Sequence, residues 1–375
     1  IMRVVLLGGG TGGHFYPLIA VARALRDIAE EEHIISMELI FIGENPFDVE
    51  ALQEENIRYE HIPAGKARRY FSARNFSDVF RTARGVFHAF LKFTLKPPDV
   101  VFSKGGYDAF PTLWAARIYR IPIVIHESDA VPGLVNKWSS KFARRIGVAF
   151  PEAMHYFSPE KTALVGNPIR RGIIGGSEDE AFDIFGLESG VPVVLVLGGS
   201  QGAQKINEVI LTALPELVER VQVIHSTGQI HYEGVKGEAE VVLASSAHKK
   251  RYHPYPLLQI SQLRNAAFVA DVVISRSGAG SIFEIAAWQV PAILIPIANS
   301  AQDHARENAY NYARTGAAEV VEEENLTPHL LQSEIMHIIE DTERRTEMKQ
   351  AAGSFAKLDA AQKIANELIR LGIHE

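Results

Sequence analysis

The sequence contains no cysteine, which excludes disulfide bonds, a thiolate nucleophile and cysteine-ligated metal sites. No apolar run approaches the ~18 residues that cross a bilayer, so any membrane contact is expected to be peripheral. The apolar run after Met2 ends at Gly8, too early for a signal peptide. Acidic residues outnumber basic ones, and the net charge of −7 argues against a general nucleic-acid-binding protein.

The length and the order of apolar segments predict two α/β domains. A chain of 375 residues exceeds the ~250–300 at which one hydrophobic core stops growing. Short β-branched runs alternate with helix-length segments, as in a parallel sheet covered by helices. The expected strands are 4–7, 39–42, 100–102, 123–125, 146–149 and 163–165, then 193–197, 221–225, 272–275, 292–295 and 318–320. The sequence therefore predicts two Rossmann-like, doubly wound domains.

The domain boundary is expected at Gly166-Asn167-Pro168, where the last strand of the first set ends. The first domain then covers 1–167 and the second 168–353. A last helix is predicted over 354–371 from apolar residues at helical spacing, with Gly372 as its stop signal. We expect this C-terminal segment, 354–375, to pack back on the first domain.

Three glycine-rich turns each follow a predicted strand and precede a predicted helix, at 8–14, 198–203 and 275–281. Backbone N–H groups in such a turn can approach an anion at the helix N-terminus. The two turns of the second domain suit a nucleotide diphosphate, and Glu284 can accept hydrogen bonds from both ribose hydroxyls. Any one of these turns could be a plain strand–helix connection, but three at matching positions favour ligand-binding loops.

The first turn also matches the dinucleotide fingerprint through Gly8, Gly10 and Gly13. That fingerprint requires an acidic residue about 20 residues further on, whereas Glu44, the one candidate, lies roughly 30 residues on. His14, inside the loop, has no role in a dinucleotide site. A redox cofactor and a purely structural turn remain the alternatives to a substrate-facing loop.

The glycine-rich turns, together with further motifs along the chain, resemble those of the MurG family. Its members are two-domain GT-B enzymes whose Rossmann-like domains face a cleft. The resemblance runs in order through 9–14, 104–107 with Pro111, 126–127, 133–137, 166–170, 199–203, 276–279 with Glu284, and 308–309. It implies inverting transfer of N-acetylglucosamine from a UDP-sugar to the muramyl sugar of undecaprenyl-pyrophosphoryl-muramyl-pentapeptide, a step of peptidoglycan synthesis. Related lipid glycosyltransferases, such as those making galactolipids, share part of the motif set.

Carried over by position, the resemblance implies which residues meet each substrate. Those expected to hold the UDP-sugar are Ser200, Gln201, Ser277, Gly278, Ala279 and Glu284, with Thr11, Gly12 and Asn136 from the first domain. Those expected on the acceptor side are Gly13, His14, Tyr107, His126, Glu127 and Asp129. The resemblance places Arg170 near the donor diphosphate or the hinge between domains. The family has Asn at position 129 and Gln at position 305, where this chain has Asp129 and Ala305, and Gln302 is the expected substitute for that Gln.

Inverting glycosyl transfer requires a base and a means of neutralising the departing diphosphate. No Asp-x-Asp ends a predicted strand and no His/carboxylate set has metal-site spacing, so we expect no obligatory metal or other cofactor. Arg170, hydroxyl groups and a helix N-terminus would then stabilise the leaving group. His14 is the first candidate base because imidazole has an ordinary pKa of about 6.5, and Glu127 is the second. The alternatives are a His14 that only donates a hydrogen bond and a Glu127 held in a structural ion pair.

The segment from Lys66 to Lys96 reverses the charge of the chain, with eight basic residues against one acid, Asp78. It also carries seven aromatic residues, several at helical spacing, which suits a helix lying on anionic lipid at about 1 kcal/mol per basic residue. The expected membrane contacts are Arg74, Phe76, Phe80, Arg81, Arg84 and Phe87. The alternative is a core helix with a solvated basic face. With the resemblance, this segment predicts a peripheral protein on the cytoplasmic face of a bacterial plasma membrane.

Competing functions use the same scaffold without a lipid acceptor. An epimerase or hydrolase acting on a nucleotide sugar would release its product with no acceptor present and would have no use for the basic segment. A lipid glycosyltransferase using another UDP-sugar is the nearer alternative. A binding module without activity is disfavoured by His14, Glu127 and Glu284.

Overall fold

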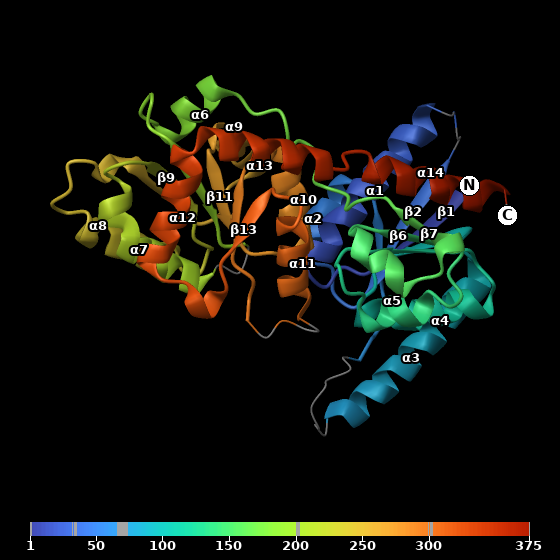
Figure 1. The fold of residues 1–375 in the computed structure, drawn as a ribbon. Helices are drawn as coiled ribbons and strands as arrows, with labels where there is room; N and C mark the ends of the chain where they lie inside the picture. The colour runs from blue at the N-terminus through green and yellow to red at the C-terminus, as the bar shows by residue number, and fades with distance from the viewer. Residues whose placement is uncertain are drawn as a thin grey trace. The chain divides into compact units, whose positions relative to one another are not determined.

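The computed structural model describes residues 2–31, 33, 36–65, 74–199, 203–298, 300 and 303–374. The chain divides into two compact units (Figure 1): unit 1 is Ile1–Arg170 with Lys357–Glu375, and unit 2 is Arg171–Ala356. Each boundary lies three residues beyond the position expected from the sequence. Unit 1 is therefore built from both ends of the chain.

Within the described residues, unit 1 contains a seven-stranded parallel sheet in the order β3-β2-β1-β4-β5-β6-β7. Its strands are β1 Met2–Leu7, β2 Met37–Gly43, β3 Arg58–His61, β4 Val100–Ser103, β5 Ile123–Glu127, β6 Arg145–Val148 and β7 Thr162–Leu164. Its helices are α1 Gly12–Glu31, α2 Val49–Glu54, α3 Arg74–Leu95, α4 Phe110–Ile118, α5 Leu134–Ser139 and α14 Ala360–His374. Short 3-10 turns are Tyr107–Ala109, Pro151–Tyr156 and Pro159–Lys161. Apolar side chains cover both faces of the sheet, one against α1 and α14 and the other against α3 and α4.

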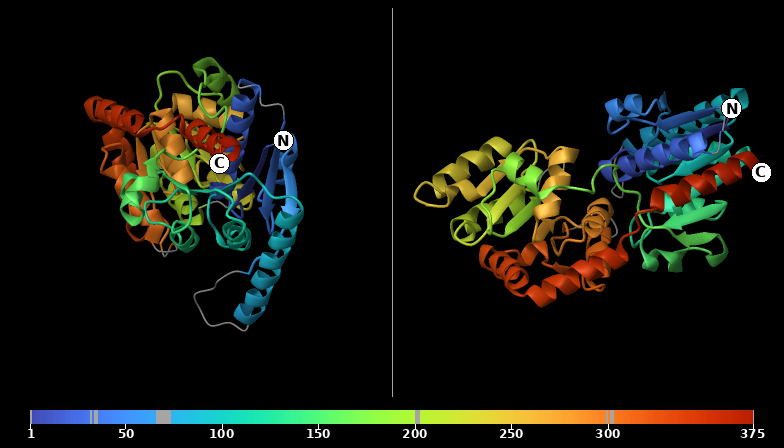
Figure 2. Two further views of the ribbon diagram at one scale, coloured as in Figure 1. Left: turned by 90° about the vertical axis from the view of Figure 1, so that its right-hand side faces the viewer. Right: turned by 90° about the horizontal axis from the view of Figure 1, so that it is seen from above.

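The C-terminal segment packs on unit 1, but it is not the single helix that its periodicity predicts. Helix α13 ends at Phe355 and α14 begins at Ala360. The expected stop signal, Gly372, lies inside α14, where a Cβ would come within 2.3 Å of the Met2 side chain. Glycine at this position lets α14 lie against β1 and β4, beside α1, as Figures 1 and 2 show.

Unit 2 repeats this architecture with six parallel strands in the order β10-β9-β8-β11-β12-β13 within the described residues. The strands are β8 Val193–Leu197, β9 Gln222–Ser226, β10 Tyr252–Tyr255, β11 Val272–Ser275, β12 Ala292–Leu294 and β13 Ala318–Val320. The helices are α6 Glu178–Phe185, α7 Gln204–Leu217, α8 Tyr232–Val242, α9 Ile260–Val269, α10 Ala279–Trp288, α11 His304–Ala313, α12 Pro328–Glu340 and α13 Thr342–Phe355. Its main apolar cluster joins α7 and α12 to the sheet.

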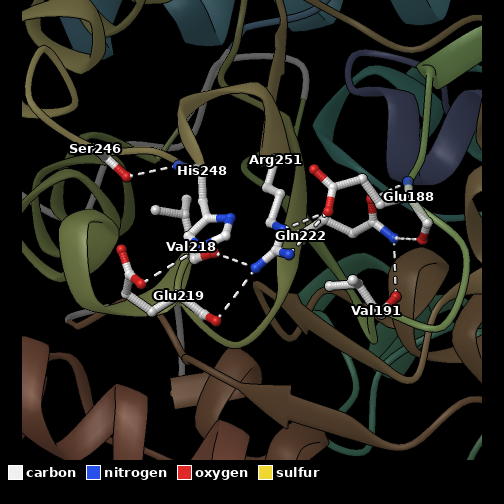
Figure 3. Close-up of polar contacts among 8 residues, drawn as sticks. All are labelled: Glu188, Val191, Val218, Glu219, Gln222, Ser246, His248 and Arg251. Carbon is white, nitrogen blue, oxygen red and sulfur yellow. Dashed lines mark hydrogen bonds and ion pairs between the residues drawn. The ribbon is translucent and has the colours of Figure 1, made fainter.

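Two polar side chains hold the loops at the amino edge of this sheet, before β9 and β10 (Figure 3). The buried amide of Gln222 donates to the Glu188 and Val191 carbonyl oxygens, at 2.9 and 2.8 Å. The Arg251 guanidinium donates to the carbonyl oxygen of Val218 at 2.9 Å and to the Glu188 carboxylate at 2.8 Å. Since Val218 is the C-cap of α7, Arg251 both satisfies and electrostatically complements that helix end.

The eleven strands expected from the sequence are all present, with shifts of one or two residues at some ends. Two further strands, β3 and β10, lie at sheet edges and were not predicted. Strand β3 is mostly exposed and carries charged residues, and β10 contains Pro254, which an edge strand tolerates because it forms a ladder on one side alone. Their sequences therefore lack the continuous apolar run of a central strand.

Candidate functional site

In unit 1, the strand order reverses between β1 and β4. The helices that follow these two strands, α1 and α4, therefore pack on opposite faces of the sheet, while the loops that lead to them lie side by side at its carboxyl edge. Ligands of doubly wound folds bind in the crevice at such a reversal. The two loops, 8–11 and 104–106, approach each other closely. Gly8 has a φ of +92°, and a Cβ there would lie 2.5 Å from the Gly105 carbonyl oxygen. Only glycine fits at this position.

Glu127 ends β5 at this edge, where its buried carboxylate accepts hydrogen bonds from amide groups. Oε1 accepts from the backbone N–H of Asp129 at 3.0 Å, and Oε2 accepts from the Gly133 N–H at 3.1 Å and the Asn136 side chain at 2.9 Å. Amide donors, and not the ion pair considered from the sequence, hold this side chain. Burial, reinforced by the charge of Asp129, raises the pKa of Glu127 to about 7. A carboxyl group with such a pKa can exchange a proton near neutral pH.

His126 does not line the acceptor side as expected, because it is fully buried with both ring nitrogens bonded inside unit 1. Nε2 lies 2.8 Å from the Gly166 carbonyl oxygen, which can only accept, so Nε2 carries the proton. Nδ1 faces the amino group of Lys104 at 2.6 Å. Burial, reinforced by the positive charge of Lys104, holds the pKa of His126 well below its ordinary value. His126 is therefore a buried support of this edge.

Asp108 joins the two loops, although the sequence analysis did not single it out. Its buried carboxylate accepts from the backbone N–H groups of Gly9 and Ala109. Burial raises the pKa of Asp108 to about 6, and burial also raises the pKa of the half-buried Tyr107 beside it. The one signal in the sequence was an acidic residue directly after the motif 104–107.

The residues expected from the first glycine-rich turn lie at the start of α1, which begins inside the turn, at Gly12. Thr11 and Gly13 are exposed, while Gly12 and His14 are half-buried. The backbone N–H of His14 donates to the Thr11 carbonyl oxygen at 3.1 Å. Its Nδ1 lies 3.8 Å from where a Cβ would sit on Gly106, so the imidazole faces the loop after β4.

Unit 2 has an open cavity of about 680 Å3 at the carboxyl edge of its sheet, again where the strand order reverses. Helices α7, α10 and α11 start at this cavity, and none has a side-chain hydrogen bond at its N-cap. The lining residues are Ala203, Gln204, Lys205, Glu208, His231, Arg276, Ser277, Gly278, Ile297, His304, Ala305 and Glu323. The N–H groups at these helix starts, together with cationic side chains, favour an anion.

Within this cavity, Ser277 and Arg276 are held in place by the protein itself. Ser277 Oγ donates to the Ala305 carbonyl oxygen at 2.6 Å, which ties the third glycine-rich turn to the start of α11. Arg276 is paired with the Glu323 carboxylate and donates to the Ile295 carbonyl oxygen at 3.3 Å. Arg276 and Lys205 adjoin the glycine motifs in sequence, whereas Glu323 comes from a distant segment and carried no sequence signal.

Some residues expected at the donor are not brought into this cavity. Ala279 is buried and Glu284 half-buried on α10, and neither is among the described residues that line it. Arg170 ends unit 1, with its guanidinium carbon 5.5 Å from the ring centre of Tyr16, a cation–π distance. Ser200, Gln201 and Gln302 lie outside the described residues.

Helix α3 turns an apolar face to solvent. Its buried side, which includes Ala89 and Phe93, packs toward α4. Figures 1 and 2 show the N-terminal part of the helix extending beyond α4. Its exposed apolar residues are Val79, Phe80, Phe87, Phe90, Leu91 and Leu95, with exposed fractions from 38% to 81%. Arg84 is exposed beside them, whereas Arg81 is paired with the Glu44 carboxylate. Residues 66–73 and the side chains of Arg74 and Phe76 lie outside the described part.

A core helix with a solvated basic face therefore does not describe α3, because large apolar side chains occupy its exposed face. Among the described helices, none is both long enough and apolar enough to cross a membrane. The described residues also contain no group of three or more His, Asp and Glu placed to hold a metal ion.

Comparison with known proteins identifies relatives along the whole chain. The N-terminal domain of glycosyltransferase family 28 matches residues 4–148, and its C-terminal domain matches residues 193–367. A UDP-N-acetylglucosamine--N-acetylmuramyl-(pentapeptide) pyrophosphoryl-undecaprenol N-acetylglucosamine transferase from Clostridium kluyveri is 34% identical, covering 97% of this chain and 98% of its own. The enzyme of the same name from Lachnoclostridium phytofermentans is 36% identical, covering 90% of this chain and 91% of its own.

Solved structures agree with this assignment. The crystal structure of Acinetobacter baumannii MurG has a TM-score of 0.77 and 26% identity, covering 99% of this chain and 100% of that one. A UDP-GlcNAc 2-epimerase from Neisseria meningitidis, bound to UDP-GlcNAc, has a TM-score of 0.69 over 98% of this chain and 100% of that one. At 14% identity, the epimerase shares the fold alone.

These findings confirm the two Rossmann-like domains of the GT-B architecture and the resemblance inferred from the motifs. The chain belongs to glycosyltransferase family 28 and, within it, to the MurG family of UDP-sugar-dependent transferases.

Proposed function

We propose that this protein transfers N-acetylglucosamine from UDP-N-acetylglucosamine to the muramyl sugar of undecaprenyl-pyrophosphoryl-muramyl-pentapeptide, a step of peptidoglycan synthesis. The observation that carries the proposal is identity of 34% along 97% of the chain to a transferase named for this reaction. Identity at this level and coverage favours the transferase over the hydrolase and over the epimerase, and the likeness to the epimerase extends to the fold alone.

The cavity of unit 2 is the proposed donor site. Its volume of about 680 Å3 is within the usual range for small-molecule sites. The helix starts at Ala203 and Gly278, together with Lys205 and Arg276, offer N–H donors and positive charge to a diphosphate. Ser277 and Gly278 line this cavity and are proposed donor residues. Ser200, Gln201, Ala279, Glu284 and Gln302 stay proposed donor residues on the resemblance alone, as do Thr11, Gly12, Asn136 and Arg170 in unit 1.

The carboxyl edge of unit 1 is the proposed acceptor side, with His14 as the base and Glu127 as the second candidate. In the reaction, the acceptor hydroxyl oxygen bonds to the sugar carbon while the bond from that carbon to the diphosphate breaks. The hydroxyl proton passes to His14, and UDP leaves with the bonding electrons. Gly13, Tyr107 and Asp129 are proposed to contact the acceptor.

Charge on the departing diphosphate is then stabilised by the protein, so we propose that no metal is obligatory. Preorganised donors aimed at developing charge supply the largest single contribution in many enzymes. Lys205, Arg276 and the uncapped start of α10 are suited to this role. Transfer that persists in excess EDTA would support the proposal, and a loss restored by Mg2+ would overturn it.

An assay of UDP release tests the transferase proposal directly. UDP-N-acetylglucosamine, UDP-galactose and UDP-glucose are each supplied with and without the lipid-linked muramyl pentapeptide. We expect release with UDP-N-acetylglucosamine when the acceptor is present, together with a product one N-acetylhexosamine heavier. Release without acceptor, or a 2-epimer of the donor, would instead favour the epimerase or hydrolase, and preference for another sugar would favour a different lipid glycosyltransferase.

We also propose that α3 docks on an anionic membrane, which places the protein peripherally at the cytoplasmic face of the plasma membrane. Exposed Phe80 and Phe87 beside Arg84 have the composition of an interfacial helix. Sedimentation with phosphatidylglycerol vesicles and with phosphatidylcholine vesicles tests this. We expect binding to the phosphatidylglycerol vesicles that Phe87→Glu weakens. The matched change Phe268→Glu, at an exposed phenylalanine of α9 in unit 2, should not weaken it. Equal and negligible binding to both vesicles would contradict the proposal.

A further inference from the structure

Lys104 is the most deeply buried cationic side chain at the carboxyl edge of unit 1 among the described residues, with 2% of its surface exposed. It directly follows β4, and its backbone N–H continues the ladder by donating to the Leu7 carbonyl oxygen at 2.9 Å. Gly105 and Gly106 follow with φ values of +81° and +88°, so the main chain turns away while the Lys104 side chain stays inside. Burying a lysine is costly, and its partners must therefore account for its position.

The Lys104 amino group has three partners, which matches the three donors of an ammonium group. Its Nζ lies 2.6 Å from His126 Nδ1 and 3.0 Å from Asn167 Oδ1, and it also bonds to Ser128 Oγ. None of the three is a carboxylate. Lys104 thus links the end of β4 to the end of β5 and to the segment after β7 through hydrogen bonds to uncharged side chains.

Two of these partners, His126 and Ser128, are the chain neighbours of Glu127. His126 and Ser128 both bond to Lys104 Nζ. Because successive side chains of a strand point to opposite faces, Glu127, the last residue of β5, faces away from His126. On its own face, Glu127 is held by Asn136 and by backbone amides. Lys104 therefore bonds to the side chains on both sides of Glu127 and not to the Glu127 carboxylate.

The third partner extends the crosslink to the point where the chain leaves unit 1. Asn167 follows Gly166, whose carbonyl oxygen accepts from His126 at 2.8 Å. A Cβ on Gly166 would lie 2.3 Å from Lys357 Cβ, so the returning chain passes directly over the same residue. Unit 1 ends at Arg170 and resumes at Lys357. The segment that leaves unit 1 is thus bonded to the strand end that carries Glu127, and the returning segment passes beside it.

We propose that Lys104 is a positioning residue for glycosyl transfer, which holds Glu127 in place through His126 and Ser128 and couples it to the segment at Asn167. The proposal rests on the proposed function, because its catalytic readout is the transfer reaction. A misplacement of about 1 Å at a reacting group can lower the rate roughly 100-fold. Hydrogen bonds that hold Glu127 in place would therefore keep the rate of transfer high.

The charge environment supports this role. Burial is the main cause that lowers the pKa of Lys104 to about 7, opposed by the negative charges of Glu127 and Asp129. The titratable groups around the cluster are Lys104 directly after β4, His126 and Glu127 at the end of β5, Asp129 shortly after it, and His14 on α1. Loss of the Lys104 charge removes a cation near Glu127 and should raise the Glu127 pKa further.

The test uses the full-length protein with Lys104→Met, Lys104→Arg and the control Lys161→Met, which changes a half-exposed lysine of the same unit. Steady-state rates are measured with both substrates, and the Glu127 carboxyl is titrated by 13C NMR, with Glu127→Gln for assignment. For Lys104→Met we expect kcat to fall about tenfold or more with the donor KM nearly unchanged, because the hydrogen-bond partners of Lys104 include none of the proposed donor residues. The Glu127 midpoint should rise, and Lys104→Arg should restore part of both.

Several results would overturn the proposal. One is a folded Lys104→Met protein with wild-type kcat and an unmoved Glu127 midpoint. Another is a fall in kcat that only matches the loss of folded protein. If Lys104→Met does not fold, Ser128→Ala removes one partner alone, and it should move the same two readouts less far; no movement there would count against the role. If the wild type transfers no sugar, the proposed function fails, while the titration still tests Lys104.

Discussion

The two sheets share a strand order, but the charged groups at their carboxyl edges differ in exposure: those of unit 1 are buried, and those of unit 2 line an open cavity. In unit 1, Lys104, Asp108 and Glu127 are each less than 5% exposed, and burial is the main cause of every one of their pKa shifts. In unit 2, charged side chains such as Arg276 and Lys205 line an open cavity of about 680 Å3.

This difference separates two tasks that one fold can perform. Burial moves a pKa toward neutrality, which suits proton transfer but leaves little room for a large ligand. An open cavity at helix starts keeps its donors available to a diphosphate and leaves its charges near solvent. We infer that unit 1 is built for the reacting proton and unit 2 for the departing nucleotide.

The largest expected effect comes from the proposed base in unit 1. His14→Ala should lower kcat by roughly 100-fold or more, because general base catalysis contributes on that scale. The donor KM should change less than about twofold, since the proposed donor contacts in unit 2 remain. Initial rates across pH 5.5–9 with both substrates saturating provide the measurement.

The control for His14 is His155→Ala, which removes an exposed histidine of the same unit and should leave the rate unchanged. An unchanged rate and an unchanged acid limb in His14→Ala would remove His14 as the base. Glu127 would then be the remaining candidate, and the division between the two units would still stand.

A smaller effect of a different kind is expected in unit 2. Arg276→Ala removes a cation from the cavity and leaves Glu323 without its partner, so the donor KM should rise about tenfold. The acceptor KM should stay near the wild-type value. Substrate titrations for each reactant measure both constants.

Arg251→Ala is the matched control for Arg276→Ala, because it deletes an arginine at the opposite edge of the same sheet (Figure 3). It should lower the free energy of unfolding and leave both KM values unchanged. If Arg251→Ala raised the donor KM as much as Arg276→Ala, the result would contradict the proposal that the cavity is the donor site.

The smallest expected effect is the pH dependence set by Asp129. Native Glu127 has a pKa of about 7 against an ordinary 4.5, so the native state binds extra protons between these values. The free energy of unfolding therefore falls as the pH rises from 4.5 to 7. Asp129→Asn removes the neighbouring charge and lowers the native pKa of Glu127, so this fall should shrink by roughly 1 kcal/mol. Urea unfolding at pH 5, 6, 7 and 8 measures it.

Asp183→Asn, an exposed site in unit 2, should leave the slope with pH unchanged. A slope in Asp129→Asn equal to that of the wild type would show that desolvation alone sets the Glu127 pKa. The contrast between the two edges would then rest on burial without help from neighbouring charges.

Central strands were predictable because each is a short apolar run between turn residues. Strands β3 and β10 were missed because charged residues, histidine or proline interrupt any apolar run in them. The edge strands β7 and β13 keep apolar residues and were predicted, so edge position alone does not hide a strand. Gly372 was misread as a helix stop, since the sequence alone does not reveal that Met2 and Val100 pack against it. A glycine that ends a helix and one that admits a neighbour look alike in sequence.

The site residues likewise divide into those that local sequence patterns predict and those that depend on contacts between distant segments. Glycine-rich turns after strands identified both carboxyl edges, including Ser277 and Gly278 at the cavity and His14 beside the loop after β4. The burial of His126 was not predictable, because its partners Lys104 and Gly166 are far away in the sequence. Asp108 was overlooked for a similar reason, since its role depends on the backbone of Gly9.

The sequence by itself determined the two parallel-sheet domains and the glycine-rich loops at their carboxyl edges, because hydrophobic period and turn chemistry are local properties. Only the tertiary structure decided which polar residues are buried, which charges meet, and that Lys104 braces the strand end carrying Glu127. A pKa shift or a buried crosslink depends on groups brought together from distant segments, and no local pattern encodes such a meeting.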